Sequence, residues 1–153
     1  MQKTLKILGV LTLIFICIVG ISIGVVAYKG DELDDQSKAY VDAAIPAIAG
    51  KWDQEQLVIR STPSLRESIT PDQLSTLFWR LSLLGPLVRY EGSSGQSAMS
   101  YFNGVSRVTA LYVAKAQFKN GNATFHIALL KLNGQWLING FRVDPKVDTG
   151  SQN

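Results

Sequence analysis

Residues 7–28 contain no charged side chain, and this run constrains the chain more than any other feature. As a helix rising about 1.5 Å per residue, its 22 residues would extend about 33 Å, which is enough to cross the hydrocarbon core of a bilayer. The alternative is a cleaved secretory signal with Val25 and Ala27 at the small-residue positions before the cut, but the run is longer than the apolar core of such signals. We therefore expect residues 1–29 to form a cytoplasmic stub and a retained transmembrane anchor.

The basic residues around this run predict its orientation. The amino terminus, Lys3 and Lys6 precede the run, whereas Lys29 alone follows it directly. Basic flanking residues, rather than carboxylates, set the orientation of a span. We expect a single-pass protein of the inner (cytoplasmic) membrane with residues 30–147 as an extracytoplasmic domain in the periplasm or outside. The small polar residues 148–153 are expected to form a flexible tail.

Two glycines in the run are candidates for contact with another transmembrane helix. Gly20 and Gly24 lie one helical turn apart, so a neighbouring helix could approach this face closely. Glycine is also common in membrane spans that make no such contact. A contact at this face would join the chain to a second copy or to another membrane protein.

The charge balance argues against a nucleic-acid partner. The chain has 15 Lys and Arg against 12 Asp and Glu and a pI of 9.1. Lys3, Lys6 and Lys29 flank the anchor, which leaves 12 basic against 12 acidic residues elsewhere. No basic stripe interleaved with aromatic residues is present, so we expect no nucleic-acid binding.

A first helix is predicted after the anchor. The acidic residues of 31–35 favour a helix that begins there. Apolar residues at helical spacing follow, namely Tyr40, Val41, Ala44, Ile45 and Ile48. Pro46 should bend or split this helix, unless the helix already ends near Gly50.

A second helix has clearer boundary signals. Thr70 is a predicted N-cap, Pro71 suits the first turn and Gln73 occupies the capping-box position. The predicted core stripe comprises Leu74, Leu77, Phe78, Leu81 and Leu84, and Gly85 with Pro86 ends the helix. Residues 51–68 are expected to form a turn-rich connector anchored in the core by Trp52, Leu57 and Leu65.

The last third of the chain has the pattern of antiparallel hairpins. Asn120-Gly121 and Asn133-Gly134 separate apolar runs, and this dipeptide favours tight two-residue turns. A turn at Asn120-Gly121 pairs Phe118 with Ala123, Ala116 with Phe125, Ala114 with Ile127 and Tyr112 with Leu129. The second turn puts Trp136 and Ile138 on the same core side. A bulge at Asn139-Gly140 would return Phe141 and Val143 to that side. "EGSSGQS" is interpreted as a flexible turn between two shorter strands, "LVRYE" and "SAMSYF".

Helices followed by a curved antiparallel sheet make an α+β roll. This layout, the helix end "LSLLGPL" and the closing hairpin "NGQWLINGFRV" resemble the nuclear transport factor 2-like (cystatin-like) superfamily over roughly residues 35–145. The resemblance includes small uncharacterised bacterial domains behind a single anchor. It implies helices packed on a cone-shaped sheet that holds a pocket or provides a dimer surface. Enzymatic members that resemble polyketide cyclases or ketosteroid isomerases carry Asp or His inside the cone, whereas the predicted core side here has neither.

No residue pattern indicates catalysis or a metal site. His126 is the single histidine, and the register puts it on the outer face beside Lys115, as a surface residue of a strand. We expect no catalytic residue, no metal and no cofactor. The candidates for lining a pocket on the core side are aromatic, namely Trp52, Trp79, Tyr112, Phe125 and Trp136, although large aromatic residues in a small domain commonly just fill the core.

Three functions are compatible with these sequence features. The first is a membrane-anchored, non-catalytic interaction or scaffold domain, as a homodimer or as an accessory subunit of an envelope complex. It resembles the scaffold subunits of type IV secretion systems, which carry one span and this fold. The second is a carrier or sensor of a small apolar ligand held in the cone. The third is a cyclase-like or isomerase-like enzyme, which would need an acid or histidine pointing into the cone.

Overall fold

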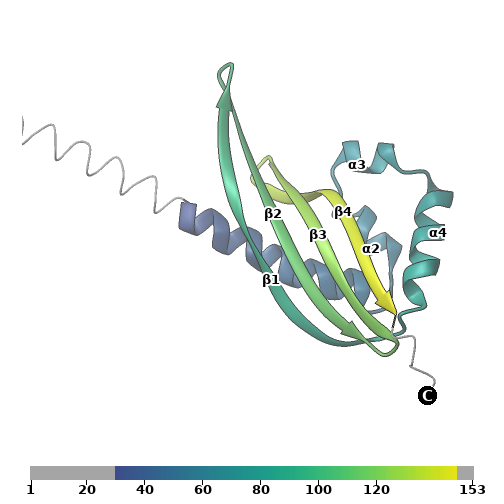
Figure 1. The fold of residues 1–153 in the computed structure, drawn as a ribbon. Helices are drawn as coiled ribbons and strands as arrows, with labels where there is room; N and C mark the ends of the chain where they lie inside the picture. Colours follow the sequence, from purple (N-terminus) through teal and green to yellow (C-terminus); the bar gives the residue numbers. More distant parts are fainter. Residues whose placement is uncertain (1–29, 148–153) are drawn as a thin grey trace, which may run out of the picture. The chain divides into compact units, whose positions relative to one another are not determined.

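The computed structural model describes residues 30–147 of the chain. The chain divides into two compact units, Met1–Leu33 and Asp34–Asn153, and the second unit is an α+β domain in which helices precede a curved four-stranded antiparallel sheet (Figure 1). This confirms the α+β part of the predicted fold class, with helices before a curved antiparallel sheet. The predicted anchor with Gly20 and Gly24, and the predicted tail 148–153, lie outside the described residues. Within 30–147, no helix combines the length and the apolar character that a membrane span requires.

The first helix covers residues 30–49. It buries the predicted apolar stripe, including Val41, Ile45 and Ile48, each at most 1% exposed. The helix is not split at Pro46 and ends near Gly50, which is the alternative that the sequence left open. There the Gly50 N–H donates to the Pro46 carbonyl at 2.9 Å. Ile45 and Ile48 are buried on both sides of the proline, so packing compensates for the one hydrogen bond that its nitrogen cannot donate.

The stretch expected to be a connector contains two short helices, so this part of the prediction is wrong. Helix α2 spans Gln54–Val58 behind the N-cap Asp53, and α3 spans Pro63–Ser68 behind the N-cap Thr62. Both helices are too short for apolar periodicity to reveal them, and the sequence indicated them through their N-cap residues. Leu57 is buried as expected.

Helix α4 spans Pro71–Ser82 and begins as predicted. The Thr70 side chain accepts from the Gln73 N–H at 3.3 Å, and the Gln73 side chain accepts from the Thr70 N–H at 3.1 Å. These reciprocal bonds form a capping box, which satisfies two backbone donors that the helix itself leaves without partners. Phe78 and Leu81 of the predicted stripe are buried.

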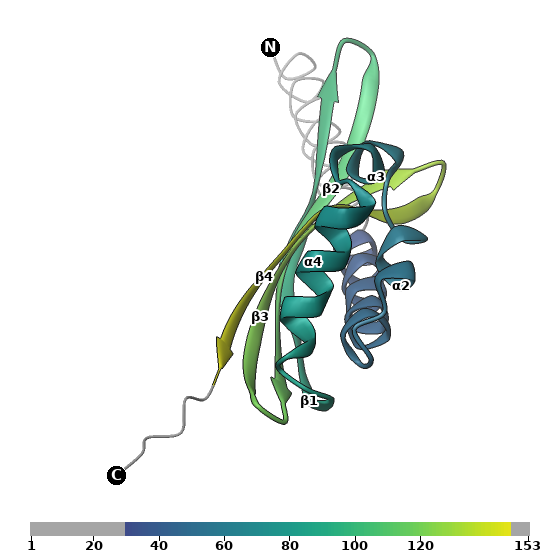
Figure 2. The same ribbon diagram turned by 90° about the vertical axis from the view of Figure 1, so that its right-hand side faces the viewer.

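The sheet has the order β1-β2-β3-β4, and every neighbouring pair is antiparallel. Its strands are β1 (Leu87–Phe102), β2 (Val105–Phe118), β3 (Gly121–Leu132) and β4 (Gln135–Val147). The helices pack on one face, which we call the inner face, and the opposite or outer face has no covering layer among the described residues (Figure 2).

Strand β1 is one continuous strand of 16 residues, so the interpretation of "EGSSGQS" as a flexible turn is wrong. Its glycines and serines are adapted to close pairing. A Cβ on Gly95 would lie 2.0 Å from the Leu111 carbonyl oxygen on β2, so only glycine fits there. The hairpin to β2 turns at Asn103-Gly104, with φ of 49° and 80°. This turn was not among the predicted ones, although it has the same Asn-Gly dipeptide as 120–121 and 133–134.

The β2–β3 hairpin turns one residue earlier than expected, at Lys119-Asn120, so each β2 residue pairs with a β3 residue two positions earlier than predicted. Phe118 pairs with Gly121, Ala114 with Phe125 and Tyr112 with Ile127. Asn120 is engaged elsewhere, because its side-chain amide donates to the Leu83 carbonyl at 3.0 Å beyond the end of α4. A slip of two residues preserves which face each side chain occupies, so the predicted inner side is correct while the pairs are wrong.

The last hairpin matches its prediction. Asn133-Gly134 is the two-residue loop, with Leu132 paired to Gln135, and Trp136 and Ile138 are buried with Leu129. The register shifts where Asn139 is left without a partner, which is the predicted bulge. After the bulge, Phe141 pairs with Ile127 on the inner side and its ring lies 6.1 Å from that of Phe125.

Candidate functional site

The inner side of the sheet is filled by aromatic rings at the place where a pocket was considered. The Trp52 ring stacks on Phe118 at 5.0 Å and on Phe125 at 6.3 Å between ring centroids. Tyr112 and Trp136 are also buried, at 2% and 7% exposure. Close stacking of this kind fills a core and contributes to stability beyond the buried area alone.

Trp79 does not lie in this cluster, so its prediction as a pocket-lining residue is wrong. Its side chain is 65% exposed on α4, whereas its neighbour Phe78 is buried. A helix turns by about 100° per residue, so the residue after a core position points away from the core. A cleft of about 380 Å³ lies at α2, α3 and α4 and is lined by none of the five predicted residues.

The described residues show no chemical cluster on the inner side. The buried polar residues there are Ser37, Ser61 and Thr62, with no Asp, Glu or His among them. No group of three or more His, Cys, Asp or Glu residues within 30–147 could hold a metal ion.

Polar contacts from the first helix hold strand β1 in place. Asp42 Oδ1 accepts from the Tyr90 hydroxyl at 2.7 Å and from the Ser93 hydroxyl at 2.6 Å. Farther along β1, Asp34 Oδ1 accepts from the Ser97 backbone N–H at 2.6 Å. The serines that looked like turn residues are therefore the partners of helix carboxylates, and this fixes the register of the helix on the sheet.

Asp42 should make stability depend on pH. Burial tends to raise the pKa of Asp42, but hydrogen bonds from Lys38, Ser93 and Tyr90 outweigh it and lower the pKa. A lowered folded-state pKa contributes stability above the unfolded-state value of about 3.9, and this contribution is lost as the pH falls through the folded pKa. We expect Asp42→Asn to lower the urea midpoint of the detergent-solubilised chain at pH 6, and the difference from wild type to shrink by pH 3.

The exposed carboxylate Glu67 on α3 supplies the control for that titration. Glu67→Gln should leave the urea midpoint nearly unchanged at pH 6. A wild-type advantage over Asp42→Asn that stays constant from pH 6 to pH 3 would contradict the assigned role of the Asp42 carboxylate.

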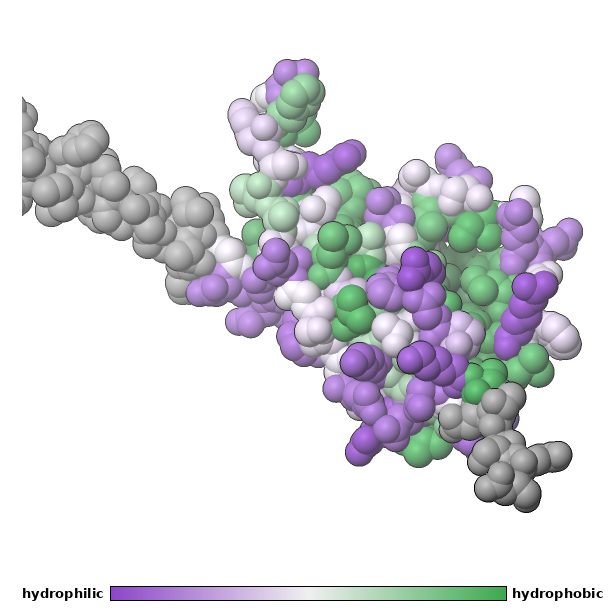
Figure 3. All heavy atoms as spheres, in the orientation of Figure 1, coloured by the Kyte–Doolittle hydropathy of each residue, from purple (hydrophilic) through white to green (hydrophobic). Residues whose placement is uncertain are grey.

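The outer face of the sheet has an apolar centre that is open to solvent. Leu111 is 68% exposed and Val113 is 37% exposed, and they lie on β2 near the middle of the sheet. A groove of about 500 Å³ crosses this centre and reaches Ala128 on β3 and Gly140 on β4. Figure 3 views this side and shows apolar surface between polar margins. Large exposed aliphatic side chains beside small ones form a shallow apolar surface that another molecule can contact.

Charge is segregated between the helices and the sheet, although residues 30–153 together carry no formal net charge. Residues 31–72 contain nine Asp and Glu against four Lys and Arg. Residues 92–143 contain no Asp or Glu, and their basic residues are Arg107, Lys115, Lys119, Lys131 and Arg142. The sheet therefore has a positive bias that the total charge conceals.

His126 lies on the outer face as predicted, but its neighbours differ from the prediction. It pairs with Val113 and Arg142 rather than lying beside Lys115, which pairs with Thr124. Its Nε2 is 3.0 Å from Asp144 Oδ2, and Arg142 donates to the same oxygen at 2.7 Å. The hydrogen bond from Arg142 lowers the pKa of Asp144. The exposed side chains of His126, Arg142 and Asp144 form a local charged cluster at the edge of the groove.

Comparison of the chain with models of protein families, with curated proteins and with solved structures finds no match.

Proposed function

We propose that the protein is a membrane-anchored, non-catalytic accessory subunit whose outer sheet face binds a protein partner in the cell envelope. The observation that carries this proposal is the exposed apolar centre of that face, with Leu111 68% exposed on a sheet whose other face is packed by helices. Exposed apolar surface bordered by polar residues is typical of protein–protein interfaces. A single membrane span at residues 7–28 would hold the domain beside its partner.

Charge favours a partner with an acidic rim over a second copy of the chain. Within the described residues, no carboxylate forms an ion pair with Arg107 or Lys115, and both are exposed on the outer face. Two copies joined face to face would bring these cations toward each other, which disfavours association. A partner with Asp or Glu around an apolar centre would complement them.

The α+β arrangement supports placing the domain in the nuclear transport factor 2-like superfamily, as an anchored scaffold rather than an enzyme or a carrier. Those two alternatives need free space and functional groups on the inner side. The stacked rings of Trp52, Phe118 and Phe125 occupy that side, and the described buried polar residues carry hydroxyl groups alone. The outer face has the exposed surface that recognition of a protein requires.

Leu111→Lys should abolish partner binding. The full chain, tagged and solubilised from its native membrane in mild detergent, is expected to retain its partner, and Leu111→Lys is expected to reduce recovery of that partner at least about tenfold because a charge is placed in the apolar centre. Val88→Lys is the matched control, since Val88 is 67% exposed on the same sheet but lies outside the groove.

Equal loss in both variants, or no loss in Leu111→Lys, would contradict the proposal. The molecular mass of the purified chain in detergent then shows whether the chain is a monomer or a dimer. A dimer that Leu111→Lys converts to a monomer would identify a second copy as the occupant and overturn the acidic partner.

A further inference from the structure

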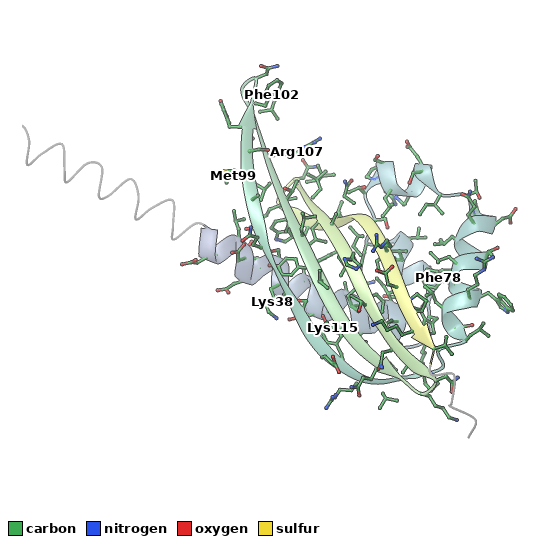
Figure 4. The ribbon with its side chains drawn as sticks, in the orientation of Figure 1. Lys38, Phe78, Met99, Phe102, Arg107 and Lys115 are labelled. Atoms are coloured by element: carbon green, nitrogen blue, oxygen red, sulfur yellow. The ribbon has the colours of Figure 1, made fainter. Side chains whose placement is uncertain are left out.

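The β1–β2 hairpin extends beyond the rest of the sheet as a two-stranded arm. Strand β2 pairs with β3 from Thr109 onward, so residues 98–108 are paired within the hairpin alone. Figures 1 and 4 show this arm projecting past the ends of β3 and β4, with Met99, Phe102 and Arg107 on it. A two-stranded ribbon without a third strand or a helix on it has little stability of its own. We call residues 98–108 the arm.

The arm exposes its largest apolar side chains instead of burying them. The exposed fractions are 59% for Met99, 75% for Tyr101, 76% for Phe102 and 68% for Val105. Phe102 and Val105 pair beside the turn on one face, while Met99 and Tyr101 occupy the other. Because apolar residues lie on both faces of the tip, a flat partner surface would cover half of them. A medium that surrounds the tip would cover all of them.

The charges of the arm suit an anionic surface. The arm has no carboxylate, and its one charged residue is Arg107, two positions after Val105 on β2. At about 3.3 Å per strand residue, burial of the tip to about 7 Å would place Arg107 at its edge. That is the depth at which peripheral segments insert into the interface of a bilayer, with cations at the headgroups.

The base of the arm lies next to the start of the domain. Asp34 Oδ1 accepts from the backbone N–H of Ser97, the residue directly before the arm. Five residues lie between Tyr28, the end of the uncharged run, and Asp34. Six residue steps separate Ser97 from Asn103 at the turn, which corresponds to about 20 Å along a strand. The arm therefore begins beside the residues that directly follow the predicted anchor in the sequence, and its tip extends about 20 Å from there.

From these observations we infer that the tip of the arm, around Tyr101, Phe102 and Val105, inserts into the interface of the bilayer that holds the anchor. Tyrosine and other amphipathic aromatic residues are enriched at that level of the membrane. Insertion gives the domain a second attachment point besides the span and so restricts its tilt on the membrane. The inference rests on the anchor that is part of the proposed function, but not on the protein partner at Leu111.

A fluorophore at the tip tests this insertion. The full chain carries one cysteine, Cys17, so a Cys17→Ser background allows single labelling at Phe102→Cys with an environment-sensitive dye. The labelled chain is reconstituted in vesicles of phosphatidylcholine and phosphatidylglycerol. We expect blue-shifted emission and quenching by nitroxide-bearing lipids of at least about half, as for a group in the acyl boundary. Val88→Cys, at the opposite end of β1, should remain quenched by aqueous iodide instead.

The outcomes separate the arm from the anchor. Membranes from cells that express the chain are first extracted at alkaline pH. Release of the chain from these membranes would overturn both the anchor and this inference. Retention of the chain together with iodide quenching at Phe102→Cys equal to that at Val88→Cys would overturn insertion alone. A blue shift that rises with protein density without lipid quenching would assign the tip to a second copy and also overturn insertion.

Arg107→Glu is expected to weaken lipid quenching in the anionic vesicles, and high salt should weaken it in the unsubstituted arm.

Discussion

Replacing Phe125 by alanine is expected to cost about 3–5 kcal/mol of unfolding free energy, the range for a phenylalanine removed from a packed core. Phe125 is fully buried, and its ring lies within 6.4 Å of those of Trp52, Phe118 and Phe141. The rings come from separate elements, so they cannot collapse into the space without moving the sheet. Urea unfolding of the solubilised chain, followed by tryptophan fluorescence, gives the value.

Phe102→Ala is the matched control, because it removes the same atoms from a side chain that is 76% exposed. It should change the unfolding free energy by less than about 0.5 kcal/mol. If Phe125→Ala leaves no folded protein, Phe125→Leu, which keeps most of the volume, should show a smaller loss of about 1 kcal/mol. Similar effects at Phe125 and Phe102 would contradict the assignment of Phe125 to the packed core.

Gly95→Ala is expected to be the second large change, with a loss of about 1–3 kcal/mol from overpacking. The added Cβ would lie 2.0 Å from the Leu111 carbonyl oxygen and 2.8 Å from the Tyr112 Cα, and both are backbone atoms. The strands must therefore move apart, because no flexible side chain can yield. Thermal unfolding of this variant is compared with that of Ser94→Ala, at the neighbouring exposed position, which should unfold close to wild type.

The faces of the sheet could be predicted because strand periodicity is robust. Ala114, Phe125 and Ile127 lie on the inner side whichever pairs they form, since a slip of two residues does not reverse a side chain. The register itself could not be read from Asn120, because the role of its side chain depends on the end of α4, which is distant in sequence. Tertiary contacts of this kind are absent from any local pattern.

The polar residues of β1 were misread for a related reason. Glycine and serine normally indicate a turn, yet Ser93 and Ser97 bond to Asp42 and Asp34 on the first helix. A helix that lies across the strand supplies partners that the sequence near the serines does not contain.

The exposed surface was only partly visible in the sequence. Alternation predicted a wetter outer side with His126 and Lys115, but the run around Leu111 and Val113 is apolar on both faces, as in a strand buried on both sides. The absence of carboxylates between Glu91 and Asp144 was available as a signal, and it becomes informative once those residues are seen to form one sheet.

Position-specific photo-crosslinking in the native membrane would identify a protein bound to the outer face. A photoreactive benzoylphenylalanine replaces Leu111 or Val88, both of which are highly exposed, and the cells are irradiated before lysis. We expect a light-dependent adduct between the chain at position 111 and one acidic-surfaced protein, with no such adduct at position 88. No adduct at position 111, or the same adducts at both positions, would contradict a specific partner on the outer face.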